Sequence, residues 1–176
     1  MALSITYFTY EQIRAKADGA LAKYHPKGTA PVPVQAIVEF GYEIDVIPIP
    51  GLQKVYEVEA FTGRDQKTIH IDQGVFESRS PNRYRFSLAH ELGHIDLHQP
   101  VFAQLQFSTI EQWKTAMMQF PENQRETLEF QAHDFAGLFL VPLPLLRVNL
   151  AQAIRILKRA QEGVAVRCVH MCRPPR

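Results

Sequence analysis

Apolar residues recur every three or four positions along most of the chain, which is the period of a helix with one buried face. Residues 10–24 show this spacing most clearly, through Ile13, Ala17, Ala20 and Leu21. Other segments with helical spacing or helix start signals are expected to form helices: 34–40, the segment from 80 to just before Pro100, 108–118, 121–140 and 143–160. The chain is therefore expected to be mainly helical.

Three short segments between the second and third helices instead alternate apolar and polar residues and are rich in β-branched side chains. They cover residues 42–48, 55–61 and 68–72, and the last two are separated by a cluster of turn-forming residues. We expect them to form a small three-stranded antiparallel sheet. The predicted fold class is α+β, a helical bundle around one central helix with this sheet beside it.

The composition is that of a small globular protein. With 176 residues and 46% hydrophobic content, one domain over 1–176 can bury most of its apolar surface, with a core at about 31–145 and a basic helical segment over 146–176. No apolar run approaches the roughly 18 residues of a membrane span, and no signal-peptide pattern is visible. A cytoplasmic location, away from membranes, is expected, and Cys168 and Cys172 are expected to be reduced thiols.

Residues 90–94 read His-Glu-Leu-Gly-His inside a predicted helix. Histidines four positions apart lie on one helix face, so His90 and His94 can bind a single metal ion. Glu91 cannot easily bind the same ion together with the two histidines, but its carboxylate can reach the open coordination position and take a proton from a bound water. This arrangement is typical of zinc metallopeptidases.

The alternative is a solvated helix with histidines on its polar face, and two features of the surrounding sequence favour the metal site. Gly93 costs about 1 kcal/mol relative to alanine in a helix interior, which is tolerated where a neighbour or ligand must come close. The flanking residues are also mostly apolar, so that unpaired histidines would be costly: Phe86, Leu88, Ala89, Leu92, Ile95 and Leu97.

A catalytic zinc site needs a third protein ligand. His98 lies about 12 Å along the helix from His90 and is too far to share its ion. On the predicted helix over 121–140, Glu129 and His133 share one face with two alanines, a shallow strip against which another helix can press. The residues alone leave open whether Glu129 is a ligand or an ordinary surface carboxylate.

Two blocks of sequence carry a resemblance to a known family. The first is Arg-Phe-Ser-Leu-Ala-His-Glu-Leu-Gly-His over 85–94, and the second is Glu-Phe-Gln-Ala-His-Asp-Phe-Ala over 129–136, followed by an apolar stretch that ends at Pro142. Together they resemble the ImmA/IrrE family of metallopeptidases, over roughly residues 31–145. The resemblance implies a Zn²⁺ ion, one per chain, bound by His90, His94 and Glu129, with Glu91 as the catalytic base.

His133 departs from the family pattern, in which asparagine or aspartate is usual at this position. Its role as a neighbour of a ligand, an extra ligand or a donor to the transition state stays open, and Asp134 is a further candidate for such a role. The strand over 68–72 precedes the active-site helix, so Ile69, His70 and Ile71 are candidates for a sheet edge that holds the substrate backbone. The alternative for each of them is an ordinary packed strand residue.

The resemblance also implies a protein substrate, a helix-turn-helix DNA-binding repressor in mobile-element or stress regulation. The alternative is a non-catalytic metal-binding module or toxin-antitoxin component that sequesters its partner, but the presence of Glu91 favours the enzyme. From Arg147 onward the sequence has seven Lys or Arg residues and one acidic residue, Glu162. This leaves 12 basic and 17 acidic residues before that point. No nucleic-acid motif accompanies the basic end, so direct nucleic-acid binding is not expected.

Overall fold

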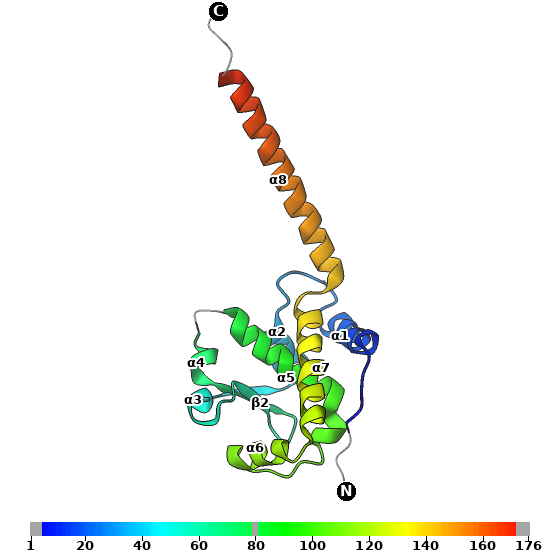
Figure 1. Cartoon of the computed structure of the whole chain (residues 1–176), viewed down its shortest axis with the longest axis vertical. Coiled ribbons are helices and arrows are strands. Elements are labelled where there is room, and N and C mark those ends of the chain that lie inside the picture. The colour runs from blue at the N-terminus through cyan, green and yellow to red at the C-terminus, as the bar shows by residue number, and fades with distance from the viewer. Residues whose placement is uncertain (1–4, 79–80, 172–176) are drawn as a thin grey trace, which may run out of the picture. The chain divides into compact units, whose positions relative to one another are not determined.

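The computed structural model describes residues 5–78 and 81–171, which fall into two units, Met1–Val141 and Pro142–Arg176. The first unit contains α1 (Tyr10–Tyr24), α2 (Val34–Ala36), η1 (Ile37–Gly41), β1 (Asp45–Ile49), α3 (Leu52–Tyr56), β2 (Ala60–Thr62), β3 (Thr68–Asp72), α4 (Gln73–Phe76), α5 (Pro81–Phe102), α6 (Ile110–Met118) and α7 (Glu122–Leu140) (Figure 1). The second unit contains α8 (Leu143–Met171). The α+β fold class is confirmed.

Helix α1 shows how local sequence signals determine where a helix begins and which face it buries. Thr9 caps α1 in a capping box with Gln12, which satisfies backbone donors that the first turn leaves free. The four α1 residues predicted to be buried are those that the helix buries: Ile13, Ala17, Ala20 and Leu21. Among the described residues, no single helix is both long and apolar enough to cross a membrane, although α7 and the first part of α8 pass that test as a pair.

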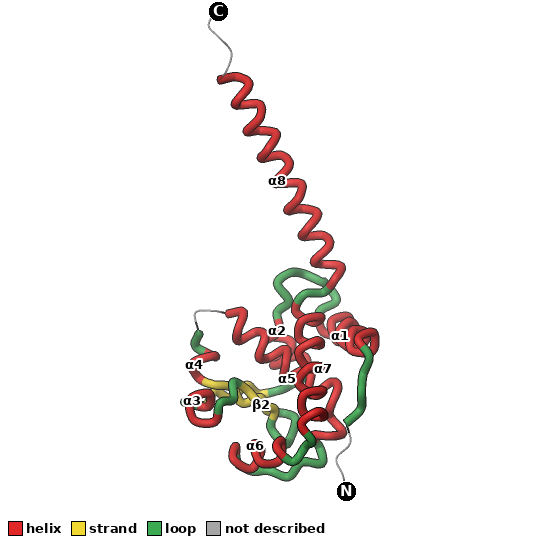
Figure 2. Tube along the Cα trace, viewed as in Figure 1, coloured by secondary structure: helices red, strands yellow, loops and turns green. Residues whose placement is uncertain are grey.

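The sheet differs from the predicted antiparallel one. Its order is β1-β3-β2, in which β1 and β3 are parallel and β2 and β3 are antiparallel. The strands are drawn in yellow in Figure 2. Parallel neighbours need a crossover between them, and the segment that contains α3 and β2 supplies it. The predicted strand over 55–61 is wrong in its first half, because residues up to Tyr56 belong to α3. This helix ends where Glu57 adopts a positive φ of 61°.

The expectation that the active-site helix ends before Pro100 is also wrong, because α5 continues to Phe102. A proline inside a helix leaves the carbonyl four residues earlier without its N–H donor. Here that carbonyl belongs to Asp96, and the Lys16 ammonium group from α1 donates a hydrogen bond to it at 3.0 Å. A tertiary contact thus takes the place of the missing backbone bond.

Helices α5 and α7 pack against each other at Gly93, and they cross in the view of Figure 1. A Cβ atom on Gly93 would lie 3.0 Å from both the Cα and the carbonyl oxygen of Ala132 and 3.2 Å from the Cβ of Phe135. The first two contacts are with backbone, which cannot move aside as a flexible side chain can. The glycine expected from the sequence to permit a close approach does so, and it sets the distance between the two helices that carry the site.

Gly93→Ala is expected to destabilise the protein by about 2 kcal/mol, because overpacking against backbone outweighs the gain of about 1 kcal/mol in helix propensity. Urea unfolding followed by circular dichroism would measure the change. Gly137→Ala on α7 is the matched control, because an added Cβ there meets nothing within 4 Å, and it should stabilise the protein slightly. Equal stability changes at the two positions would contradict the close-packing account of Gly93.

Candidate metal centre

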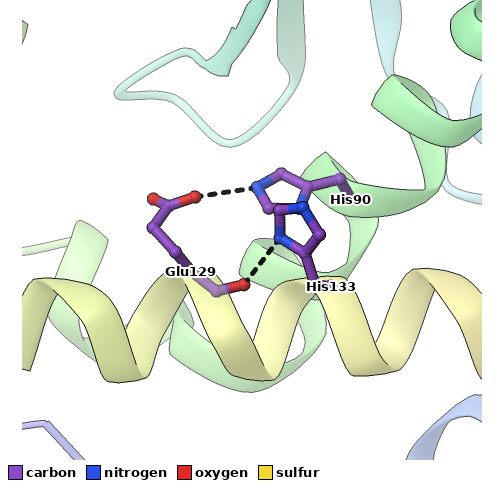
Figure 3. Close-up of side chains that lie close together, drawn as sticks. All are labelled: His90, Glu129 and His133. Carbon is purple, nitrogen blue, oxygen red and sulfur yellow. Dashed lines mark hydrogen bonds and ion pairs between the residues drawn. The ribbon is translucent and has the colours of Figure 1, made fainter.

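Three side chains predicted to bind metal converge where α5 and α7 cross. The Nε2 atoms of His90 and His94 lie 3.1 Å apart. Glu129 on α7 brings its two carboxylate oxygens to them, with Oε2 at 3.1 Å from His90 Nε2 and Oε1 at 3.6 Å from His94 Nε2. Figure 3 shows Glu129 directed at His90 from the neighbouring helix. The structure therefore brings together all three residues that the resemblance implied as ligands.

The spacing of these three donors fits a single small metal ion. Ligand atoms about 2.0–2.2 Å from a tetrahedral zinc ion are about 3.4 Å from one another. The two separations of 3.1 Å, from His90 Nε2 to His94 Nε2 and to Glu129 Oε2, lie near that value, and the separation of 3.6 Å from His94 Nε2 is to the other carboxylate oxygen, Oε1. Two imidazoles and one carboxylate also match the donor types of catalytic zinc, and three protein donors leave one position open.

Burial and mutual contact set the protonation states of these groups. Burial lowers the pKa of His94 to about 3, so its imidazole is neutral. Burial alone would raise the pKa of Glu129, but the hydrogen bond with His90 and the neighbouring imidazoles hold it at about 2, and the carboxylate is ionised. For His90, burial is outweighed by Glu129 and Glu91, which raise its pKa. Neutral His94 and ionised Glu129 are the forms that a metal requires.

Glu91 lies against the sheet and not among the three donors. Its side chain is only 4% exposed, and the Thr62 hydroxyl donates a hydrogen bond to Oε2 at 2.8 Å. Burial raises the pKa of Glu91 to about 7, a value suited to accepting and releasing a proton near neutral pH. Thr62 was expected only in the turn-forming cluster after the second predicted strand, and its hydrogen bond to Glu91 was not foreseen. A hydroxyl residue directly after that predicted strand was the signal that could have indicated it.

A pocket with a volume of about 480 Å³ opens onto these residues. One wall is formed by Val58, Glu59, Ala60 and Thr62. Another wall is apolar and is formed by Phe102 at the end of α5 and by Trp113 and Met117 of α6. His90, Glu91, His94 and Glu129 all line the pocket. The catalytic candidates thus share one cavity that has room for part of a peptide.

The predicted substrate strand is corrected by the sheet order. Ile69, His70 and Ile71 lie on β3, which pairs with β1 on one side and β2 on the other, so its backbone groups are already used. His70 stacks on Phe61 at a centroid distance of 4.7 Å and lines a different pocket. The edge strand beside the metal centre is β2, which the predicted strand over 55–61 overlaps only at Ala60 and Phe61.

His133 lies at the mouth of the site. Its Nδ1 donates to the backbone oxygen of Glu129 at 3.0 Å, because a carbonyl oxygen can only accept, so the neutral ring carries its lone pair on Nε2 (Figure 3). His90, Glu129 and His133 can each place a ligand atom within 4.8 Å of the others. Asp134 is about 140° around the helix from Glu129 and does not line the pocket.

His133→Asn is expected to weaken metal binding by about tenfold, because the shorter amide removes an imidazole lone pair beside the donors. Competition with a chromophoric chelator would measure the affinity. His25→Asn is the matched control, since His25 lies outside the site and bonds to Thr29. Unchanged affinity and activity in His133→Asn would exclude a chemical role that is special to histidine.

Two histidines on one helix, a carboxylate from a second helix and a buried glutamate beside them form a cluster of the kind that could hold a metal ion. The particular family follows from the comparison of sequences: the model described as the IrrE N-terminal-like domain, Peptidase_M78, matches residues 42–168. The chain belongs to this ImmA/IrrE family of metallopeptidases, as the two sequence blocks indicated, and the match extends further toward the C-terminus than the resemblance did.

No curated protein matches the chain. A solved structure of a Mycobacterium tuberculosis transcriptional regulator is similar in fold, with a TM-score of 0.49 and 14% sequence identity. The similarity covers 81% of this chain and 44% of the regulator, so the chain spans less than half of that protein's length.

Proposed function

We propose that this chain is a zinc-dependent endopeptidase. The observation that carries the proposal is the pairing of three convergent donors with a buried carboxylate, Glu91, that the Thr62 hydroxyl holds at 2.8 Å. A purely structural metal site has four protein ligands and no use for such a base. Two imidazoles and a carboxylate favour zinc, and manganese or iron are the metals that could replace it in the cell.

The chain's own residues provide a path for the proton in peptide hydrolysis. A bound zinc ion supplies a Lewis acid that polarises the scissile carbonyl and makes water more acidic. Glu91 accepts one proton as the water oxygen bonds to the carbonyl carbon, and it returns that proton to the leaving nitrogen as the C–N bond breaks. Burial raises the pKa of Glu91 to about 7, so neither accepting nor returning the proton is strongly uphill near neutral pH.

The substrate segment is proposed to lie along β2. Among the described strands, β2 pairs only with β3, so its other edge can accept a peptide as an added strand. Ala60 and Thr62 of this strand line the same pocket as Glu91. An edge of three residues can hold only a short extended segment, which favours a flexible loop or linker over a rigid domain.

The family resemblance makes a DNA-binding repressor the first candidate substrate. Cutting a linker would separate its DNA-binding part from the part that holds the dimer together, and operator affinity would fall without any change in base contacts. The alternative function is sequestration, in which the metal-loaded protein binds the repressor but leaves it intact. The preserved base favours cleavage, because sequestration makes no use of Glu91.

The test is to incubate the zinc-loaded protein with any helix-turn-helix repressor that a neighbouring gene encodes and to follow fragments by mass spectrometry. The proposal expects a single cut in a linker that disappears when a chelator removes the metal. A repressor that stays intact in a stable complex with the zinc-loaded protein would support sequestration and overturn the proposed cleavage.

A further inference from the structure

A third histidine of α5, His98, lies one helical turn beyond His94 and does not line the pocket. His98 is 1% exposed, and its Nδ1 lies 3.2 Å from Nδ1 of His94. Its other ring nitrogen, Nε2, lies 2.9 Å from the side-chain oxygen of Gln131 on α7, which is also 1% exposed. The three side chains form one buried line of polar atoms that ends at the metal centre.

The chemistry of each atom determines which group donates and which accepts in each hydrogen bond of this line. A histidine that binds metal through Nε2 must carry its proton on Nδ1. His94 must therefore donate from Nδ1, and the only neighbour at hydrogen-bond distance that the described residues provide is Nδ1 of His98, which must accept. His98 then carries its proton on Nε2 and donates it to the Gln131 oxygen, which can only accept.

A reversed line would disable the ligand. If the Gln131 amide were turned so that its nitrogen donated to His98, His98 would in turn donate to Nδ1 of His94. The proton of His94 would then sit on Nε2, at the position that the metal needs. The orientation of one amide on α7 therefore decides whether an imidazole on α5 can bind metal.

The burial of this line means that its polar atoms depend on hydrogen bonds within the protein. The side-chain nitrogen of Gln131 is buried and has no hydrogen-bond partner among the described residues. An unsatisfied buried N–H is unfavourable, and an apolar residue of the same size would avoid it. The other ligand histidine differs, because Nδ1 of His90 is buried without a partner in the described part of the chain.

We propose that His98 and Gln131 are positioning residues that fix the tautomer and ring orientation of His94, so that its Nε2 lone pair is available to the metal. The proposal rests on the proposed metal site but not on peptide hydrolysis. His98, excluded as a direct ligand by distance, acts through His94, and Gln131 acts through His98. Helix α7 thus contributes both a direct ligand, Glu129, and the far end of the line that orients another.

Three variants test the proposal through metal affinity. Gln131→Met removes the acceptor with little change in volume, and His98→Phe removes the link itself. Both are expected to weaken zinc binding by about 10- to 100-fold, as loss of a partner of a ligand histidine generally does. Gln131→Glu keeps an acceptor and, as the ionised carboxylate, has no donor, so it should bind zinc within a few-fold of the wild type. His70→Phe makes the same change as His98→Phe at a histidine outside the site and should leave the affinity unchanged.

A second measurement reads the tautomer directly. In the metal-free protein, ¹⁵N NMR of the histidine rings is expected to show His94 protonated on Nδ1 in the wild type and in Gln131→Glu, and a mixture of tautomers in Gln131→Met. The absorption spectrum of the cobalt-substituted protein should change in Gln131→Met but not in His70→Phe. These readouts do not depend on activity, so a wild type that binds zinc but cuts no peptide would overturn the proposed function and leave this inference standing.

Wild-type affinity and an unchanged His94 tautomer in both Gln131→Met and His98→Phe would overturn the proposal. If His98→Phe does not fold, as judged by circular dichroism, Gln131→Met and Gln131→Glu still decide the question. Equal weakening in Gln131→Met and Gln131→Glu would also count against it, because only the former loses the acceptor.

Discussion

Glu91→Gln is expected to lower peptide hydrolysis by at least about 1,000-fold while the protein keeps its fold and its metal. The amide has nearly the same shape as the carboxylate and can still accept the hydrogen bond from Thr62, but it cannot take the proton from water. Hydrolysis of the cleaved linker as a synthetic peptide, together with metal content by mass spectrometry, would measure both properties. Full metal occupancy with retained turnover would remove Glu91 from the mechanism.

Glu57→Gln provides the matched control for this experiment. Glu57 lines the same pocket, but its side chain is 88% exposed and is paired with Lys114. The same neutralisation at this position should change hydrolysis by no more than a few-fold. A comparable loss in the two variants would point to the overall negative charge of the pocket and not to proton transfer by one carboxylate.

His94→Ala and Glu129→Ala are each expected to weaken zinc binding by more than about 100-fold, because each removes one of the three proposed ligands. Dialysis against a metal buffer followed by metal analysis would give the stoichiometry. Glu126→Ala, an exposed carboxylate one turn earlier on α7, should still bind one ion per chain. Unchanged stoichiometry in both ligand variants would overturn the assignment.

Metal binding should also depend on pH, with a sign that the structure sets. His90 has a raised pKa in the metal-free protein because of its contact with Glu129 and the nearby Glu91 carboxylate, and its Nε2 must lose a proton before it can bind metal. Affinity should therefore rise with pH through the pKa of His90 and level off above it. Proton release on zinc addition, measured in weakly buffered solution, should be greatest below that pKa.

The site was more predictable from the sequence than the sheet was. His90 and His94 are related by helix geometry alone, which any amphipathic helix reproduces, whereas Glu129 required the family resemblance because its distance from them depends on how α5 and α7 cross. That crossing depends on Gly93 fitting against Ala132, a contact that no local pattern encodes. The sheet order was missed because alternation indicates which residues share a face but not which strands are neighbours.

His98 shows the limit of reasoning about spacing. Its predicted distance from His90 excluded it as a candidate ligand, yet its position one turn from His94 brings two ring nitrogens to within 3.2 Å of each other. The i, i+4 relation that indicates a shared ion between His90 and His94 therefore recurs as a hydrogen bond between His94 and His98. Gln131 could not be linked to it in advance, because their contact again depends on the helix crossing.

The crossing of α5 and α7 has a mechanical consequence for the pocket. An ion held jointly by His90 and Glu129 is a cross-link between positions 39 residues apart, and closing a loop of that length removes conformational entropy from the unfolded chain equivalent to about 4 kcal/mol. The closed loop contains α6, whose Trp113 and Met117 form part of the apolar pocket wall. Metal supply would thus govern both the chemistry of the site and the rigidity of the surface that a substrate meets.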